Sequence, residues 1–193
     1  MVESDVFPCT SRSKVRKENR ASYERASSYA LVDRLKTGHL AFVENGEPRS
    51  IPITVWRHDD HLYVHTLNKG RLARLLETGC LVCLSFADCQ EWVLAKSAYH
   101  HSANYESAVL YCRGERVSDP RDFDEAFKAI IEQLEPGRWE QVRPPNTTER
   151  KATALIRLTV EEGAYKSRTG GPVEEPEDLE LPVWHGVRSA KDC

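Results

Sequence analysis

Polar side chains are concentrated in the segment Ala98–Ser107, which leads directly into an apolar run that is typical of a buried strand. The segment contains the adjacent histidines His100 and His101, followed by Tyr105 and Ser107. Imidazole groups titrate close to neutral pH, so they can take up or release a proton during a reaction. We therefore expect this segment to hold a polar, flat ligand. The alternative is a polar turn whose histidines bond only to loop carbonyl groups, and the residues alone leave it open.

Two other chemistries do not fit the spacing of these polar residues. A zinc site needs at least three ligands, and the sequence has no acidic or thiol partner at ligand spacing from the histidines. Cys80 and Cys83 have the spacing of a metal knuckle, but in a predicted strand they point to opposite faces. Hydrolysis by Ser102 or Ser107 would require a nucleophile elbow, which the sequence lacks. We therefore expect neither a metal site nor a serine hydrolase.

A second group of candidates, Lys69, Gly70 and Arg71, lies where a predicted strand ends and a short helix begins. Backbone N–H groups and the positive end of a helix dipole favour an anion at such a place. The two cations would add charge-assisted hydrogen bonds, and the glycine would let a ligand approach the backbone. The sequence has no glycine-rich phosphate loop, so a nucleotide phosphate would need a device of this kind. A solvated basic helix start is the alternative.

Trp184 is the third candidate, in the C-terminal segment Leu181–Arg188 next to an acidic loop. An indole ring can stack over a planar ligand, or it can dock the end of the chain onto the domain. The sequence does not separate these two possibilities.

The elements that must position these residues follow from hydrophobic spacing and turn signals. Asn45-Gly46 between two apolar runs predicts a hairpin, and Pro52 removes a ladder donor, which favours an edge, a bulge or a ligand there. Gly38 and Gly79 are expected to end the helices that precede them. The predicted strands are Leu40–Glu44, Arg49–Trp56, Leu62–Thr66, Leu81–Phe86, Trp92–Lys96, Ala108–Val117, Ala154–Val160 and Ala164–Arg168. The predicted helices are Ser22–Lys36, Lys69–Glu77 and a long amphipathic helix between Asp119-Pro120 and Pro136-Gly137.

This succession of elements predicts the fold class. Six or more short strands, with two or three inserted helices, indicate a mainly β protein built as a closed or partly closed antiparallel barrel. At 193 residues the chain fits one domain. We place that domain at residues 21–188, after a basic tail of residues 1–20 and before a C-terminal tail of residues 189–193.

Composition excludes several classes of partner. The formal net charge of −3 argues against nucleic acid, because phosphate binding needs a basic excess. No apolar stretch reaches the roughly 20 residues of a membrane span, and the chain does not begin with a secretory signal. We therefore expect a cytoplasmic protein with neither a membrane nor a nucleic-acid partner, in which the six cysteines are reduced thiols.

Dispersed segments of the chain resemble the pyridoxamine 5′-phosphate oxidase-like family of FMN-binding split barrels. The likeness is greatest to the subgroup that includes the nitroimidazole-resistance proteins, and it runs from about Arg20 to Val187. The segments that carry it are Arg20–Arg25, Gly38–Phe42, Ala98–Ser107, Pro136–Trp139, Arg143–Pro145 and Leu181–Gly186. Because these segments follow one another in the same order as in the family, the resemblance is more specific than any single motif would be.

The resemblance implies a six-stranded antiparallel split β-barrel that binds FMN as a homodimer, with two flavins at the subunit interface. Along the isoalloxazine edge it places Ser50, Ile51, Pro52, Ile53 and Thr54. Near the phosphate, at the end of the next strand and the start of the helix, it places His65, Thr66, Lys69, Gly70 and Arg71. From later in the chain it adds Tyr105, Ser107 and Trp184 as flavin contacts.

The implied activity is flavin redox chemistry on a small-molecule substrate, in which His100 or His101 delivers a proton or contacts the substrate. Genuine pyridoxamine-phosphate oxidase activity is not expected. Those oxidases continue to an Arg-x-His-type segment, where this chain has Gly186–Cys193. Glu106 and Glu115 are expected to place negative charge near the site, against an anionic substrate. The alternatives are a flavin carrier or sensor without turnover, and a haem-binding split barrel that depends on one of the two histidines.

Overall fold

The structure, a computed structural model, describes residues 4–191. Its strands are β1 (Ala21–Ser22), β2 (Thr37–Glu44), β3 (Glu47–Thr54), β4 (Trp56–His58), β5 (His61–Leu67), β6 (Leu81–Leu94), β7 (Ser102–Arg116), β8 (Thr153–Arg168) and β9 (Gly186–Ser189). Its α-helices are α1 (Arg25–Leu35), α2 (Arg71–Glu77), α3 (Pro120–Leu134) and α4 (Thr147–Ala152). Short 3-10 helices are η1 (Glu18–Arg20), η2 (Ala98–His100), η3 (Trp139–Gln141) and η4 (Pro176–Asp178). Within this range, no helix combines the length and the apolar character that a membrane span needs.

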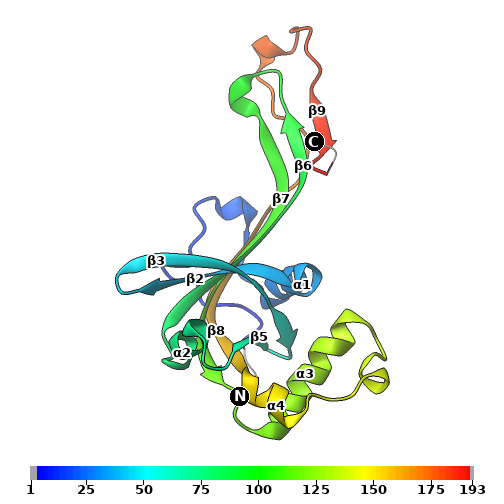
Figure 1. Cartoon of the computed structure of the whole chain (residues 1–193). Helices are drawn as coiled ribbons and strands as arrows, with labels where there is room; N and C mark the ends of the chain where they lie inside the picture. Colours follow the sequence, from blue (N-terminus) through cyan, green and yellow to red (C-terminus); the bar gives the residue numbers. More distant parts are fainter. Residues whose placement is uncertain (1–3, 192–193) are drawn as a thin grey trace.

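The strands form one antiparallel sheet in the order β3-β2-β6-β7-β8-β5-β4, with β1 paired to β8 and β9 paired to β6. The sheet curls until β3 contacts β5, which makes its lower part a barrel (Figure 1). The mainly β, antiparallel class is therefore as predicted. The sheet has nine strands in the described range rather than six, because the short strands β1, β4 and β9 add to the long ones.

Strands β6 and β8 are longer than the hydrophobic pattern predicts. The expected strands Leu81–Phe86 and Trp92–Lys96 are one strand, β6, with a register shift between Cys89 and Glu91. The two expected strands between residues 154 and 168 likewise join in β8. A bulge shifts the alternation of side chains, and polar residues beside it face solvent, so the sequence pattern has a gap where the strand continues.

The outer parts of β6 and β7 leave the barrel as a long ribbon, which β9 widens along one edge (Figure 1). We call residues 89–104 and 169–191 the arm. Strand β9 pairs with β6 from Glu91 to Leu94. Helix η2 lies at the turn between β6 and β7, so the arm carries the histidine pair away from the barrel.

The barrel core consists of aliphatic side chains from all the long strands. Buried examples are Leu40, Leu62, Val64, Leu84, Leu110, Ile156 and Leu158. Helix α1 adds Leu31 and Val32, and helix α2 adds Ala73 and Leu76. Burial of each large aliphatic side chain contributes about 1.5–3 kcal/mol. This core fixes the positions of β3, β5 and α2 relative to one another.

Helix α3 packs on the outside of the sheet. It begins as predicted, because the Asp119 carboxylate accepts the N–H of Arg121 at 2.7 Å. It ends at Leu134, just before the predicted stop at Pro136-Gly137. Its buried face joins a second apolar cluster that comprises Trp56, Tyr63, Phe123, Ala126, Ile130 and Leu155.

Three predicted backbone features are confirmed. Asn45 and Gly46 form the turn between β2 and β3 with φ of 54° and 79°. Strand β3, which contains Pro52, is an edge strand of the sheet. Gly79, with φ of 67°, follows α2 as expected.

Gly38 does not end the first helix. Helix α1 begins at Arg25, later than predicted, and its C-terminal cap is Lys36 with a left-handed φ of 54°. Gly38 lies in β2, where a Cβ atom would be 2.6 Å from the Phe86 ring. The glycine is therefore required by packing against a distant part of the chain, which local sequence does not reveal.

The basic N-terminal segment lies against the barrel. Phe7 is 2% exposed and belongs to the main core cluster. Arg12 Nε lies 2.8 Å from Glu162 Oε1, and the Thr10 hydroxyl donates to the other oxygen of this buried carboxylate. Part of the segment that the sequence assigns to a tail therefore contributes to the packed domain.

Candidate functional site

The residues predicted to face the isoalloxazine edge lie on β3, at the free edge of the sheet. Strand β3 pairs with β2 alone, so its other side has no strand partner in the described structure. Ser50, Pro52 and Thr54 are exposed, whereas Ile51 and Ile53 are half-buried against the core. The strand can therefore offer backbone N–H and C=O groups to a ligand while it stays anchored to the barrel.

The start of α2 carries a cluster of cations around one carboxylate. Arg71 Nη1 lies 3.4 Å from Glu44 Oε2, and Arg49 Nε lies 4.0 Å from the same oxygen. Lys69 is exposed nearby in sequence. The β2–β3 hairpin brings in Glu44 and Arg49, neither of which the sequence singled out as a site residue. Arg49 and Arg71 can together hold an anion, with Glu44 as an internal competitor.

Gly70 is required by a tight turn. Its N–H donates to the Leu67 carbonyl at 2.8 Å, and a Cβ atom would lie 2.8 Å from that oxygen. Helix α2 begins at Arg71 rather than Lys69 and has seven residues. The side-chain cations, rather than the dipole of so short a helix, are therefore the groups that can hold a phosphate.

His65 and Thr66, near the end of β5, point to opposite faces of the sheet because side chains alternate along a strand. The His65 ring stacks on Trp56 with centroids 5.1 Å apart and lies 6.2 Å from the Phe127 ring. Although part of the His65 side chain is exposed, its contacts with Trp56 and Phe127 keep water from the rest of the ring, and this partial burial lowers its pKa. A neutral imidazole beside α3 can accept a hydrogen bond or a proton.

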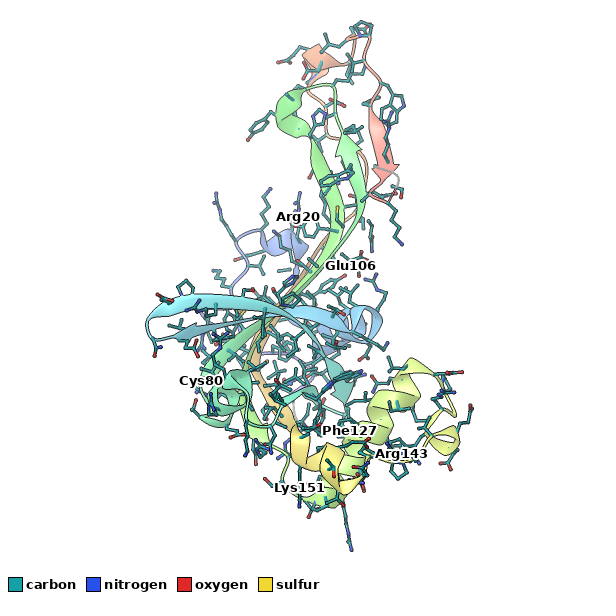
Figure 2. The ribbon with its side chains drawn as sticks, viewed as in Figure 1. Arg20, Cys80, Glu106, Phe127, Arg143 and Lys151 are labelled. Atoms are coloured by element: carbon teal, nitrogen blue, oxygen red, sulfur yellow. The ribbon has the colours of Figure 1, made fainter. Side chains whose placement is uncertain are left out.

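An aromatic-lined cavity of about 310 Å³ opens beside Phe127. Its walls include Trp139, Val142 and Arg143, which come from the loop between α3 and α4. Arg143 forms two hydrogen bonds to Glu149, at 2.8 and 2.6 Å. Figure 2 shows Phe127 and Arg143 on the part of the molecule formed by α3 and α4. The contact between Phe127 and His65 makes this cavity a neighbour of the predicted flavin residues.

Tyr105 and Ser107 lie on β7, near the point where the arm leaves the barrel. The Ser107 hydroxyl donates to the Lys166 carbonyl at 3.2 Å, and Lys166 Nζ lies 5.4 Å from the centre of the Tyr105 ring. Burial alone would raise the pKa of Tyr105, but hydrogen bonds from Lys166 and Arg20 lower it. Figure 2 shows Arg20 beside this part of the arm. The Tyr105 side chain therefore lies near two cations, Lys166 and Arg20.

Glu106 and Glu115, which are expected to place negative charge near the site, each have a cationic partner within the chain. Glu106 accepts hydrogen bonds from Arg34 and Tyr165 at the base of the arm (Figure 2). Burial, together with Glu106, raises the pKa of Tyr165 to about 12. Glu115 accepts a hydrogen bond from Arg157 at 2.9 Å. Each carboxylate is already committed to a partner inside the chain.

The adjacent histidines at the arm tip have different partners. His100 Nε2 lies 3.3 Å from Glu175 Oε1. His101 Nδ1 lies 3.0 Å from the Ser97 carbonyl oxygen. The histidines therefore cannot serve one ligand in the same way.

The C-terminal part of the arm holds a second imidazole site that the sequence did not reveal. His185 Nδ1 lies 2.8 Å from Glu174 Oε1. The same carboxylate accepts the backbone N–H of Lys96 at 3.0 Å. Burial alone would raise the pKa of Glu174, but these two hydrogen bonds lower it and keep the carboxylate ionised. The neighbouring Trp184 is 56% exposed, and the Arg188 guanidinium lies 4.9 Å from its ring centre.

The predicted site residues thus fall into two groups. One group lies at β3, the end of β5 and the start of α2. The other group lies along the arm and its base, and its members are His100, His101, Tyr105, Ser107 and Trp184. Figure 1 shows the arm running away from β3 and α2. Between residues 4 and 191, no hydrogen bond, ion pair or ring contact joins the two groups.

Comparisons with known proteins agree with this architecture. A family model described as "Pyridoxamine 5′-phosphate oxidase" matches residues 24–167. The chain is similar to the flavocytochrome Anf3 from Azotobacter vinelandii, with 33% identity, TM-score 0.86, and coverage of 93% of this chain and 84% of that one. It is similar to an FAD and haem binding protein from Mycobacterium smegmatis, with 26% identity, TM-score 0.83, and coverage of 88% and 83%.

A third solved structure shares the fold. A candidate 5-nitroimidazole antibiotic resistance protein from Bacteroides thetaiotaomicron has 16% identity, TM-score 0.61, and coverage of 76% of this chain and 85% of its own. No curated protein gives a match.

Proposed function

The chain belongs to the pyridoxamine 5′-phosphate oxidase family, and on that premise we propose that it is a flavin-dependent oxidoreductase that acts as a homodimer on a small-molecule substrate. The observation that carries the proposal is the division of the predicted flavin residues between the barrel and the arm. A second copy can bring its arm to the barrel of the first, and two equivalent sites then form by symmetry.

Exposed apolar side chains on the arm support this arrangement. Tyr99 is 89% exposed, Trp92 44% and Val187 41%. A narrow ribbon with such side chains on its surface has the character of an interaction surface rather than of a solvated loop. In the homodimer these side chains would lie against the second subunit, close to the flavin.

The barrel supplies the groups that would hold the flavin. The free edge of β3 would run along the isoalloxazine ring, and Lys69 and Arg71 would bond to the phosphate, with Arg49 beside them. Trp184 from the arm of the second copy would cover the ring, because its indole is exposed.

Histidines in different environments are the candidates for proton transfer to or from a bound molecule. Partial burial lowers the pKa of His65 and so favours its neutral form, which can accept a proton from a bound molecule. His101 keeps Nε2 free, whereas His100 uses Nε2 toward Glu175. Of the pair at the arm tip, we therefore assign proton delivery or substrate contact to His101.

The proposed cofactors are a flavin and, as a second candidate, haem. We propose FMN on the family resemblance, with FAD as the alternative because the related M. smegmatis protein binds FAD and haem. A flavocytochrome at 33% identity supports haem. A bound flavin supplies hydride and electron transfer, and a bound haem supplies one-electron chemistry. Without turnover, the same sites would make a flavin carrier or sensor.

The absorbance spectrum of the purified protein tests the proposal. Flavin bands that bleach when a nicotinamide cofactor is added support a reductase, and chromatography of the released flavin distinguishes FMN from FAD. Flavin bands that do not bleach with any reductant other than dithionite support a carrier or sensor. A colourless protein that binds neither FMN nor FAD in titration contradicts the proposal.

A further inference from the structure

The loop between α3 and α4, residues 135–146, is fixed to the helices on both sides by carboxylates. At its start, Glu132 accepts the backbone N–H groups of Gly137 at 2.7 Å and Trp139 at 2.8 Å. These two hydrogen bonds lower the pKa of Glu132. At its end, Arg143 donates two hydrogen bonds to Glu149 of α4. The loop therefore has a defined shape, and the cavity that it covers is preformed.

Most of the walls of this cavity, which has a volume of about 310 Å³, are apolar side chains, and two of them are aromatic. Phe127 and Ile131 come from α3, whereas Trp139, Val142 and Pro145 come from the loop. Nucleotide bases stack on such aromatic side chains whatever their sequence context. A volume at the lower end of the range for small-molecule pockets suits a single flat ring system.

The two charged residues that line the cavity are paired with each other. Among the described residues of its walls, Arg143 is the one cation and Glu149 is the one anion. Their hydrogen bonds, at 2.8 and 2.6 Å, lower the pKa of Glu149 to about 2 and so keep the pair ionised. A charged ring would gain little here, because each charge already has its counterion. The cavity is therefore better suited to a neutral ring, such as a purine.

The cavity lies close to the predicted phosphate site. The backbone N–H of Asn68 donates to the Ala152 carbonyl at 2.8 Å, and its side-chain amide donates to the Lys151 carbonyl at 2.7 Å. These bonds tie the residue before Lys69 to the end of α4, whose Glu149 lines the cavity. A nucleotide carries a flat base joined through a ribose to phosphate. An aromatic cavity next to phosphate-binding cations matches these parts.

We propose that this cavity binds the adenine ring of a dinucleotide cofactor, with Trp139 and Phe127 as the side chains that pack on the base. The inference rests on the proposed function, which requires a flavin and an electron donor. Two cofactors carry the adenine ring: FAD, as the flavin itself, and a nicotinamide dinucleotide, as the donor to a bound FMN. The experiment below separates these two sources.

Substitutions at Trp139 test the proposal in the purified full-length protein. Trp139→Leu keeps an apolar side chain but removes the flat ring, whereas Trp139→Phe keeps a flat ring. Leu134→Ala, at the exposed end of α3 and outside the cavity walls, is the control. Flavin titration gives the dissociation constants of FAD and FMN. The rate of flavin bleaching at increasing NADH concentration reports the affinity for the donor.

Trp139→Leu is expected to weaken binding of one adenine-containing cofactor by about 5- to 100-fold, the usual effect of removing an aromatic ring from a stacked base. If FAD fills the cavity, its affinity falls while that of FMN is unchanged. If the nicotinamide dinucleotide fills it, both flavins bind as in the wild type and more NADH is needed. Trp139→Phe should keep most of the affinity, and Leu134→Ala should keep all of it.

Three results overturn the proposal. Unchanged affinity for FAD, FMN and NADH in Trp139→Leu means that the cavity does not hold adenine. An equal loss for FAD and FMN means that Trp139 acts on the part that the two flavins share. A loss in Trp139→Phe as large as that in Trp139→Leu means that packing of the loop, rather than stacking on a base, determines the affinity.

Calorimetric titration with 5′-AMP distinguishes this inference from the proposed function. Protein that binds FMN or FAD, but in which Trp139→Leu changes the affinity for no adenine-containing ligand, refutes the adenine site and leaves the flavin proposal standing. Protein that binds neither flavin, but binds 5′-AMP at least about fivefold more weakly in Trp139→Leu than in the wild type, refutes the flavin proposal and keeps the adenine site.

Discussion

Arg71 Nη1 lies 3.4 Å from Glu44 Oε2, so one of the two cations predicted to bind a flavin phosphate has an internal counterion. Glu44 ends β2 and Arg71 begins α2, and the fold rather than the local sequence brings them together. An incoming phosphate must therefore compete with a carboxylate for Arg71. Variants of Arg71 and of Glu44 should therefore change the affinity for flavin in opposite directions.

Replacing Lys69 and Arg71 together by alanine is expected to weaken flavin binding by several kcal/mol, since each charge-assisted hydrogen bond contributes about 1.5–3 kcal/mol. Fluorescence titration with FMN measures the change. Lys151→Ala, which removes an exposed cation from α4, is the control and should bind flavin as the wild type does. Unchanged affinity in the double variant would place the phosphate elsewhere.

Glu44→Gln is expected to act in the opposite direction. Loss of the carboxylate frees Arg71 and removes a repulsive charge, so flavin should bind more tightly. Partly exposed ion pairs contribute about 0.2–1 kcal/mol, which corresponds to a gain of up to about fivefold. Glu135→Gln, which removes an exposed carboxylate just after the end of α3, is the control and should bind flavin as the wild type does. Weaker binding in Glu44→Gln would show that Glu44 contributes to the site rather than competes with the phosphate.

His65 is expected to make the protein less stable in acid. Burial lowers its pKa in the folded state, so the unfolded chain binds the proton first as pH falls below about 6.5. Stability therefore rises with pH across the window between the folded and unfolded pKa values, and falls on acidification. His65→Phe, which keeps the stacking on Trp56, should lose less stability between about pH 7.5 and about pH 5.5 than the wild type.

Urea denaturation at the two pH values measures this difference. His39→Phe, exposed on β2, controls for the general loss of an imidazole. Equal acid sensitivity of wild type and His65→Phe would mean that His65 is hydrated enough to titrate normally.

Gly38→Ala is expected to destabilise the fold by about 1–3 kcal/mol, the usual cost of overpacking a buried site. The added Cβ would lie 2.6 Å from the ring of Phe86, which is 2% exposed and cannot move aside freely. Thermal or chemical unfolding measures the loss. Gly171→Ala has open space around its Cβ position and should leave stability unchanged. Equal stability of both variants would show that Phe86 can shift.

The sequence predicts correctly those turns and helix ends that depend on neighbouring residues in the chain. Asn45-Gly46 forms the expected hairpin turn, and Asp119 caps α3 as the pattern indicates. The continuous strand β6 was missed because its polar residues around the register shift interrupt the hydrophobic alternation. Those same residues build the base of the arm.

The site was predictable only in part, for the same reason. The family likeness predicts flavin contacts on β3 and at the start of α2, and β3 is an edge strand of the sheet. The pairs Glu44–Arg71 and Glu174–His185 join residues that are separated in sequence, and no local pattern marks them. Gly70 was assigned to ligand access, although the Leu67 carbonyl explains it.

The central claim is that each flavin site combines the barrel of one chain with the arm of another. Two variants test it: Lys69→Ala with Arg71→Ala, which damages the barrel half, and Trp184→Ala, which damages the arm half. Each homodimer should bind flavin weakly. Heterodimers of the two, isolated through different affinity tags, contain one site built from an undamaged barrel and an undamaged arm. Flavin titration should recover about one tightly bound flavin per heterodimer. No recovery of binding in the heterodimer would contradict the account.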